Sequence, residues 1–297
     1  MSEDIEILSQ KYRANDEEFK RYKKDAIFTI TTGKVPSDDR TLIVVGGQSG
    51  AGKSRLIPVA KQELQKNAVV VDFDELRSLH PHYEEVNSKY TEITHRILHP
   101  DTEKVKNAVL KELIKDGYNV IYEGALRNTQ GFIDFAKDFK DNGYDIKMYI
   151  MAVPKLESYG STFLRYALAY LKNRNPRWVE KSAHDGSYEG VTRTVGAFIE
   201  QGMTNDVHVF VRGTDTPKEI YTTEGRQYRD ALDAIQQGRE MGRAKAISDF
   251  LTKYTVVKVL LQKHEPEAIQ KLGDWVKLYE EEVEHHTQLN RGSEVDD

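Results

Sequence analysis

The residues from Gly47 to Ser54 have the types and the spacing of a phosphate-binding loop. The segment matches the pattern Gly-x4-Gly-Lys-Ser/Thr. Glycines let the backbone curl so that successive N–H groups point at phosphate oxygens. Lys53 can then reach the β- and γ-phosphates of a nucleoside triphosphate, and the Ser54 hydroxyl can ligate Mg²⁺. The predicted nucleotide-binding residues are Gly47, Gln48, Ser49, Gly50, Ala51, Gly52, Lys53 and Ser54.

Acidic residues follow two of the short apolar runs. Asp72 and Asp74 come directly after residues 68–71, and Glu123 comes directly after residues 119–122. Ligands of open α/β sheets bind beyond the carboxyl ends of the strands, so these acids are candidates for chemistry. In a kinase, Asp74 or Asp72 can accept the proton of the acceptor hydroxyl. Glu123 can hold the acceptor or order Mg²⁺. The alternative for each acid is a helix N-cap.

Arginines follow a later strand pattern and can stabilise the charge of a transferring phosphoryl group. Residues 156–172 predict a helix, and Arg165 lies about 120° away from its aromatic stripe, so it can point away from the core. Arg174 and Arg177 follow in an Asn-Pro loop. The aromatic stripe favours a core position over a base-stacking platform, and its members are Tyr159, Phe163, Tyr166 and Tyr170.

Two histidine-containing segments have structural interpretations that compete with functional ones. His184 and Asp185 resemble a catalytic pair, but no nucleophile lies near them in the sequence, which favours a structural hydrogen bond. Residues 279–286 predict a solvated helical face. A metal site at His285 and His286 is the alternative, and it is disfavoured because adjacent residues of a helix do not face each other.

Strand and helix patterns alternate along the chain. Runs typical of strands buried on both faces are at 41–45, 68–71, 119–122, 146–153 and 207–211. A helix over 105–115 is predicted with Asp101 or Thr102 as its cap and Gly117 as its stop. The alternation predicts an α/β fold of the P-loop kinase type, with a mostly parallel central sheet flanked by helices. The predicted divisions are N-terminal helices (1–40), a kinase core (41–212) and a helical C-terminal extension (213–297).

The composition excludes several classes of protein. The 297 residues contain no cysteine, which rules out disulfides, Cys-ligated zinc and thiol catalysis and fits a cytoplasmic protein. The net charge of −5 argues against a nucleic-acid partner. The N-terminal residues lack the basic and apolar regions of a signal peptide. No segment approaches the roughly 18 apolar residues of a membrane span.

Taken together, these motifs resemble the zeta-toxin family of the epsilon/zeta toxin–antitoxin systems, over roughly residues 40–212. The resemblance is more specific than the phosphate-binding loop alone, because several motifs match in order. They are Val45–Ser54, Val71–Asp74 running on to His80-Pro81, Gly117–Gly124, Gly143-Tyr144 with Lys147–Pro154, Arg165-Tyr166, and Ala183–Asp185.

The resemblance implies a kinase that uses ATP or GTP with Mg²⁺ to phosphorylate UDP-N-acetylglucosamine at the 3′-hydroxyl of its amino sugar. Such a toxin starves peptidoglycan synthesis. The resemblance also implies that a small helical antitoxin blocks the nucleotide site against the N-terminal helix. The roles that it implies are general base for Asp74, sugar binding for Glu123 and Arg127, phosphate clamping for Arg165 and Arg177, and nucleotide and metal binding for Lys53 and Ser54.

One departure from the family concerns the acceptor. The family commonly has a threonine after the Glu-Gly pair, whereas this sequence has Ala125 and Leu126 before Arg127. A hydroxyl that could contact the sugar or its diphosphate is therefore missing. Two alternatives stay open on the sequence: a P-loop kinase of another small molecule, such as another nucleotide sugar, a dinucleotide or an antibiotic, and a non-catalytic nucleotide-dependent binding module.

Overall fold

The computed structural model describes residues 2–171, 177–204, 206–223 and 229–293. The chain divides into two compact units. Unit 1 comprises Met1–Val44, Ile57–Glu123 and Phe135–Lys147, and unit 2 comprises Val45–Leu56, Gly124–Asp134 and Met148–Asp297. The predicted division at residues 40 and 212 stays a prediction.

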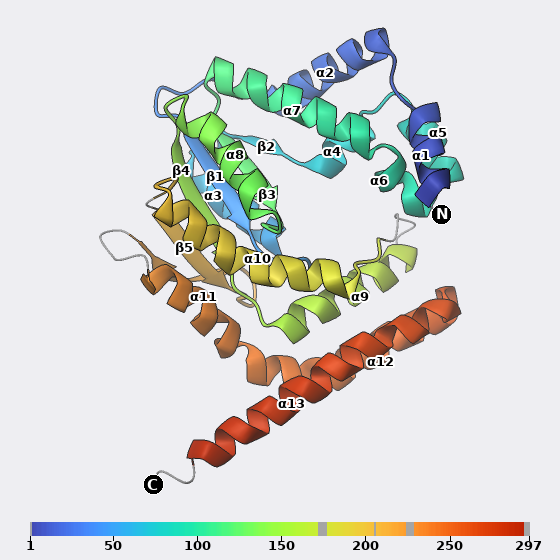
Figure 1. The fold of residues 1–297 in the computed structure, drawn as a ribbon, viewed down its shortest axis with the longest axis vertical. Helices are drawn as coiled ribbons and strands as arrows, with labels where there is room; N and C mark the ends of the chain where they lie inside the picture. Colours follow the sequence, from blue (N-terminus) through green and yellow to red (C-terminus); the bar gives the residue numbers. More distant parts are fainter. Residues whose placement is uncertain (1, 172–176, 205, 224–228, 294–297) are drawn as a thin grey trace. The chain divides into compact units, whose positions relative to one another are not determined.

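Six strands form one mostly parallel sheet in the order β2-β3-β1-β4-β5-β6 (Figure 1). All six residues of β1 are buried, as its continuous apolar run predicts. β2 and β3 pair in parallel, whereas β5 and β6 are antiparallel. The predicted α/β fold of a P-loop kinase is confirmed. The strands are β1 (Thr41–Gly46), β2 (Val69–Val71), β3 (Val120–Gly124), β4 (Asp145–Met151), β5 (Asp206–Val211) and β6 (Lys218–Thr222).

Unit 1 contains the predicted N-terminal helices, which are α1 and α2, together with α7. α2 begins in a capping box, in which the Asn15 side chain accepts hydrogen bonds from the N–H groups of Glu17 and Glu18. Buried Tyr22 of α2 donates a hydrogen bond to the carbonyl of Leu76 at 2.7 Å. The helices of this part are α1 (Ser2–Lys11), α2 (Asp16–Thr31), α3 (Ile57–Glu63), α4 (Phe73–Ser78), α5 (Tyr83–Lys89), α6 (Thr94–Ile97) and α7 (His99–Asp116), with the 3₁₀ turn η2 (Thr91–Ile93).

The predicted start of α7 is wrong. The helix begins at His99, with Pro100 in its first turn, where proline lacks only an N–H group that has no helical partner. Asp101 is not a cap. It is buried and accepts hydrogen bonds from the Arg13 guanidinium at 3.0 Å and from the Ala14 N–H at 2.8 Å. The predicted stop is confirmed, because Gly117 ends the helix in the left-handed conformation.

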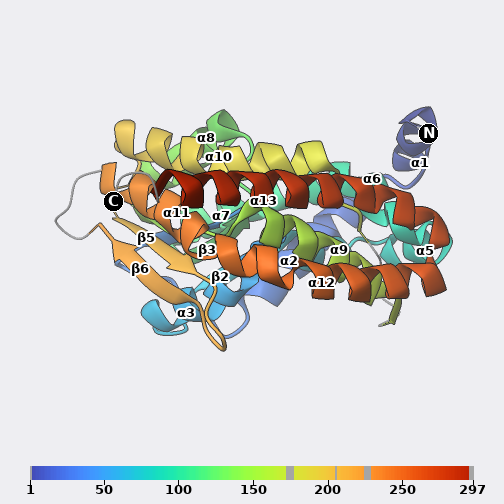
Figure 2. The ribbon, with the colours of Figure 1, turned by 90° about the horizontal axis from the view of Figure 1, so that it is seen from below.

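Unit 2 builds an apolar cluster from α9 and the C-terminal helices. Tyr159, Phe163 and Tyr166 of α9 are buried in it, which confirms the core interpretation of the stripe, while the side chain of Tyr170 lies outside the described residues. Trp275 stacks on Phe163 with ring centroids 5.2 Å apart. α12 and α13 lie beside α9 (Figure 2). The helices are α9 (Lys155–Leu171), α10 (Lys181–Glu200), α11 (Arg229–Met241), α12 (Arg243–His264) and α13 (Gly273–Ser293), with η3 (Pro266–Leu272). α8 (Thr129–Lys140) precedes β4.

The C-terminal extension predicted as helical over 213–297 also contains a strand, because β6 occupies Lys218–Thr222. β6 pairs on one side only, with β5, and it begins with the exposed residues Lys218 and Glu219. Charged side chains are common on such edge strands because they oppose edge-to-edge association. They also weaken the apolar signal by which a strand is recognised in a sequence. Among the described residues, none of the helices combines the length and apolar character that crossing a bilayer requires.

Candidate phosphate-binding and acceptor sites

The phosphate-binding loop follows β1 directly and leads into the 3₁₀ turn η1 (Lys53–Leu56). Gly47, Gly50 and Gly52 have positive φ angles of 154°, 76° and 91°. The curl also brings the Lys53 ammonium within 3.2 Å of the Gln48 carbonyl, to which it donates a hydrogen bond. The Ser54 side chain is exposed at the end of the loop. These turns are the backbone conformation that a phosphate-binding loop requires.

The first turn of α9 packs against the phosphate-binding loop. A Cβ atom on Gly50 would lie 2.0 Å from the carbonyl oxygen of Ser158, so the loop and the helix approach too closely for any other residue. Gln48 is fully buried, and its amide donates hydrogen bonds to the Val153 carbonyl at 2.8 Å and to the Ser158 hydroxyl at 3.1 Å. The start of α9 and the residue Val153 before it therefore help to hold the loop in its conformation.

His184 has the structural role that the sequence favours, but its main partner is not the predicted one. Its Nε2 lies 3.0 Å from the Ser158 hydroxyl, whereas its Nδ1 is 3.5 Å from Asp185. Burial lowers the pKa of His184 to about 4, so the ring is neutral at neutral pH. Asp185 instead pairs with Lys181 at 2.6 Å and Lys155 at 3.1 Å. Although burial opposes it, these two lysines lower the pKa of Asp185.

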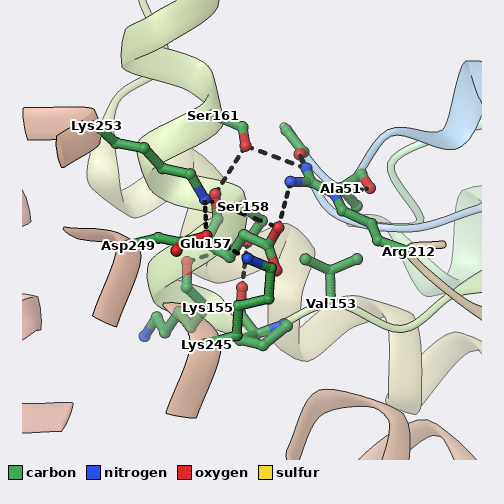
Figure 3. A network of polar contacts seen from close by, with 12 residues as sticks. Ala51, Val153, Lys155, Glu157, Ser158, Ser161, Arg212, Lys245, Asp249 and Lys253 are labelled. Atoms are coloured by element: carbon green, nitrogen blue, oxygen red, sulfur yellow. Dashed lines mark hydrogen bonds and ion pairs between the residues drawn. The ribbon is translucent and has the colours of Figure 1, made fainter. Parts of the chain in front are cut away.

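Arg212, which the sequence analysis did not single out, follows β5 and binds the outer side of the loop (Figure 3). Its guanidinium donates hydrogen bonds to the carbonyls of Gly50 and Ala51, the second at 3.2 Å. Glu157 accepts from the same guanidinium at 2.7 Å, and Ser161 does so at 3.1 Å. The only signal in the sequence is its place at the carboxyl end of a strand, where sheets of this class bind ligands.

The predicted arginines lie in unit 2, as the loop does. Arg165 is exposed on α9, which confirms that it points away from the aromatic stripe, and Arg177 is partly exposed. Arg127 is exposed and follows Leu126, which is buried with a left-handed φ of 51°. The Leu126 carbonyl accepts a hydrogen bond from the Thr194 hydroxyl at 3.0 Å, so α10 holds this unusual turn in place. Arg174 lies outside the described residues.

The predicted carboxylates lie in unit 1. Asp72 is the N-cap of α4, since its side chain accepts a hydrogen bond from the Asp74 N–H at 2.7 Å, and the cap alternative is confirmed for it. Asp74 is exposed, and its carboxylate pairs with Arg77 at 2.5 Å. The Arg77 side chain is only 10% exposed, so it is a firm support that orients the Asp74 carboxylate. Glu123 is exposed near the end of β3.

A protein-ligated metal site is not formed by the histidines of α13. His285 Nδ1 lies 2.9 Å from the guanidinium of Arg243, a cationic neighbour that disfavours a bound metal ion. The parts of the chain that the structure describes contain no group of three or more His, Asp or Glu side chains suited to a metal. A divalent ion that enters with a nucleotide differs, because Mg²⁺ commonly keeps several waters and binds one or two protein groups plus phosphate oxygens.

A sequence profile of zeta toxins matches residues 24–225. The chain is 27% identical to Toxin zeta of Streptococcus pyogenes over 253 residues, which cover 79% of this chain and 88% of that relative. It is 33% identical to Toxin PezT of Streptococcus pneumoniae serotype 4 over 171 residues, which cover 57% and 68%. A solved structure from the PezAT chromosomal toxin–antitoxin system of S. pneumoniae superposes with a TM-score of 0.73 at 26% identity, covering 83% of this chain and 98% of that one.

Proposed function

The chain belongs to the zeta toxin family, and we propose that it is a kinase that transfers the γ-phosphate of ATP or GTP to a sugar hydroxyl. The observation that carries the proposal is the loop from Gly47 to Ser54. Its glycines have the positive φ angles of a phosphate cradle, and Lys53 lies across it. The loop also packs closely on the first turn of α9, which leaves no room for a side chain at Gly50.

The positively charged groups proposed for the nucleotide side would each offset negative charge on the phosphates. Lys53 would contact the β- and γ-phosphates, and the exposed Ser54 hydroxyl would hold Mg²⁺, which would supply positive charge to the phosphates. Arg165 and Arg177 clamp the phosphates. Arginine suits this task because its planar guanidinium can donate two parallel hydrogen bonds to one phosphate.

On the acceptor side, Asp74 accepts the proton of the attacking hydroxyl. An exposed carboxylate oriented by Arg77 fits a base that must receive its substrate from solvent. Glu123 and Arg127 bind the acceptor, which we propose to be UDP-N-acetylglucosamine, phosphorylated at the 3′-hydroxyl of its amino sugar. A negatively charged diphosphate in the acceptor suits the cationic Arg127.

The family also suggests a biological role. The solved PezAT structure comes from a toxin–antitoxin system, and we propose that this chain acts in the cytoplasm as a bacterial toxin that blocks cell-wall synthesis. A small helical antitoxin that covers the nucleotide site would keep it inactive. Neither a nucleic acid nor a membrane is part of the proposal, in keeping with the net charge of −5.

An acceptor panel tests this function. Purified protein is given magnesium-ATP and, in turn, UDP-N-acetylglucosamine, UDP-N-acetylgalactosamine, a dinucleotide and an aminoglycoside, and acceptor-dependent ATP consumption is measured. Consumption with the UDP-amino sugars alone, abolished in Asp74→Asn, supports the proposal. The second candidate, a kinase of another small molecule, is favoured by Ala125, which lacks the hydroxyl expected near the sugar. Turnover with only a non-UDP compound would establish it, and nucleotide binding with no turnover on any acceptor would favour the binding module.

A further inference from the structure

The turn between β5 and β6, residues 212–217, is joined to the phosphate-binding loop by two arginines that point in opposite directions. Arg212 comes from the turn and donates to the loop. Arg55 comes from η1, just after the loop, and donates to the turn. Both belong to unit 2. We refer to this pair of arginines with their backbone acceptors as the arginine clasp.

Arg212 contacts the loop at its most constrained point. Its Nε and Nη2 donate to the carbonyls of Ala51 and Gly50, and its Nη1 donates to Glu157 at 2.7 Å. The side chains of Arg212 and Glu157 are only 24% and 16% exposed. Hydrogen bonds from a charged group that is shielded from water are stronger than those on an open surface. These contacts therefore hold the Arg212 guanidinium in one orientation, in which it donates to the loop carbonyls.

Arg55 completes the clasp from the other side. Its Nη2 donates to the Asp215 carbonyl at 2.7 Å and to the Thr214 carbonyl at 3.2 Å. The receiving turn is tight, because a Cβ atom on Gly213 would lie 2.0 Å from the carbonyl of Thr216. Arg55 and its acceptors are exposed, so this half should be weaker than the Arg212 half.

The geometry has a consequence for phosphate binding. A loop that presents its N–H groups to phosphates must turn carbonyls outward, and outward carbonyls need donors of their own. Arg212 supplies these donors at Gly50 and Ala51. Its positive charge also lies within hydrogen-bonding distance of the loop, where it favours the binding of an anion. Among the described residues, Arg212 is the side chain that donates to both of these carbonyls.

We propose that Arg212 and Arg55 are positioning residues that hold the phosphate-binding loop in its nucleotide-competent shape, with Arg212 the stronger of the two. The proposal rests on the proposed nucleotide-binding function. It further implies that the C-terminal part of the chain supports the loop. Glu157 lies 4.0 Å from Lys253 of α12, which also pairs with Asp249 at 3.6 Å (Figure 3).

Direct nucleotide binding tests the clasp without requiring an acceptor. The dissociation constant of fluorescent magnesium-ATP is measured for the wild type, Arg212→Gln, Arg212→Lys and Arg55→Gln. The matched control is Arg243→Gln, because Arg243 is 19% exposed and its described partners are Glu240, Glu282 and His285, none of which belongs to the loop. The unfolding temperature without nucleotide is recorded for each variant, and KM for the acceptor is measured where turnover is found.

Arg212→Gln should raise the dissociation constant about tenfold or more, the loss expected for two charge-assisted hydrogen bonds. Arg212→Lys should recover part of this, since one ammonium cannot serve both carbonyls and Glu157. Arg55→Gln should cost about two- to threefold. The acceptor KM should stay unchanged. Because Arg55 is exposed, its variant should fold even if Arg212→Gln does not, and an unchanged affinity in Arg55→Gln would then count against the clasp.

Two failures are distinguishable. If the wild type binds no nucleoside triphosphate, the proposed function fails and the clasp fails with it. If the wild type binds and Arg212→Gln binds within about twofold of it, the proposed function stands and the clasp is overturned. A loss in Arg243→Gln as large as that in Arg212→Gln would also overturn it, because the effect would then be that of any removed arginine.

Discussion

Replacing Gly50 with alanine should weaken nucleotide binding at least about 100-fold, and a second glycine allows the effect to be separated from simple backbone strain. Gly50 and Gly202 have left-handed φ angles of 76° and 64°. A Cβ on Gly202 would have no neighbour within 4 Å, whereas one on Gly50 would lie 2.0 Å from the Ser158 carbonyl. Both variants therefore carry the left-handed cost, but only Gly50→Ala carries a clash with backbone.

The magnitudes follow from these distances. An alanine in the left-handed region costs about 1 kcal/mol, and for a domain of this class that lowers the unfolding temperature by about 2–4 °C. Gly202→Ala should show this loss and nothing more. In Gly50→Ala the loop and the first turn of α9 must also separate by about 1 Å, because Cβ atoms essentially never approach within 3.0 Å. A displacement of that size can cost about 100-fold in a site built on geometry.

The assay pairs thermal unfolding with the binding of magnesium-ATP for both variants and the wild type. We expect Gly202→Ala to bind as the wild type does, and Gly50→Ala to lose at least about 100-fold in affinity. Wild-type affinity in Gly50→Ala would contradict this prediction, since the loop would then tolerate a side chain where the geometry leaves no room. Equal losses of affinity in both variants would refute it as well, because backbone strain alone would explain them.

Three further predictions concern the rest of the chain. Asp74→Asn should lower kcat by about 10²–10⁴-fold and leave the affinity for magnesium-ATP unchanged. A variant that loses nucleotide affinity as strongly as it loses kcat would contradict the proposed role of Asp74 as a base. Trp275→Ala should lower the free energy of unfolding in urea by about 3–5 kcal/mol, because it removes a buried ring that stacks on Phe163. A loss below about 1 kcal/mol would show that the C-terminal helices are not part of the core. Burial lowers the pKa of His184 from 6.5 to about 4, so protonation favours the unfolded chain and stability should fall by about 2 kcal/mol between pH 7 and pH 5. His184→Gln should lose this part of the pH dependence, and an identical slope in the variant would contradict the assignment.

The parts of the fold that the sequence predicts are those whose signals are local. The buried run before Gly47 and the glycine pattern itself lie within about fifteen residues, and both the strand and the loop are confirmed. Gly117 ends α7 as predicted for the same reason. The start of α7 was predicted too late because Asp101 is a good cap by type, although Pro100 is the stronger mark of a first turn.

The parts that the sequence does not predict depend on distant partners. Arg212 is one arginine among many, and its partners Glu157, Ser161 and Ala51 lie 51 to 161 residues away along the chain. Likewise, the hydrogen bond between His184 and Ser158 follows only from the packing of α9 against α10. β6 is hidden by the exposed charges that protect an edge strand. In each case the missing information is tertiary contact and not residue type.

The position of the transferred phosphate on the sugar is the decisive measurement for the proposed kinase. The protein is incubated with magnesium-ATP and UDP-N-acetylglucosamine, and the product is analysed by mass spectrometry and by phosphorus NMR, with Asp74→Asn and Arg243→Gln as paired variants. We expect one added phosphate on the 3′-hydroxyl of the amino sugar, formed by the wild type and Arg243→Gln and absent with Asp74→Asn. An unmodified sugar under conditions in which the protein binds ATP would contradict the proposed acceptor. A phosphorylated sugar formed equally well by Asp74→Asn would contradict the proposed base.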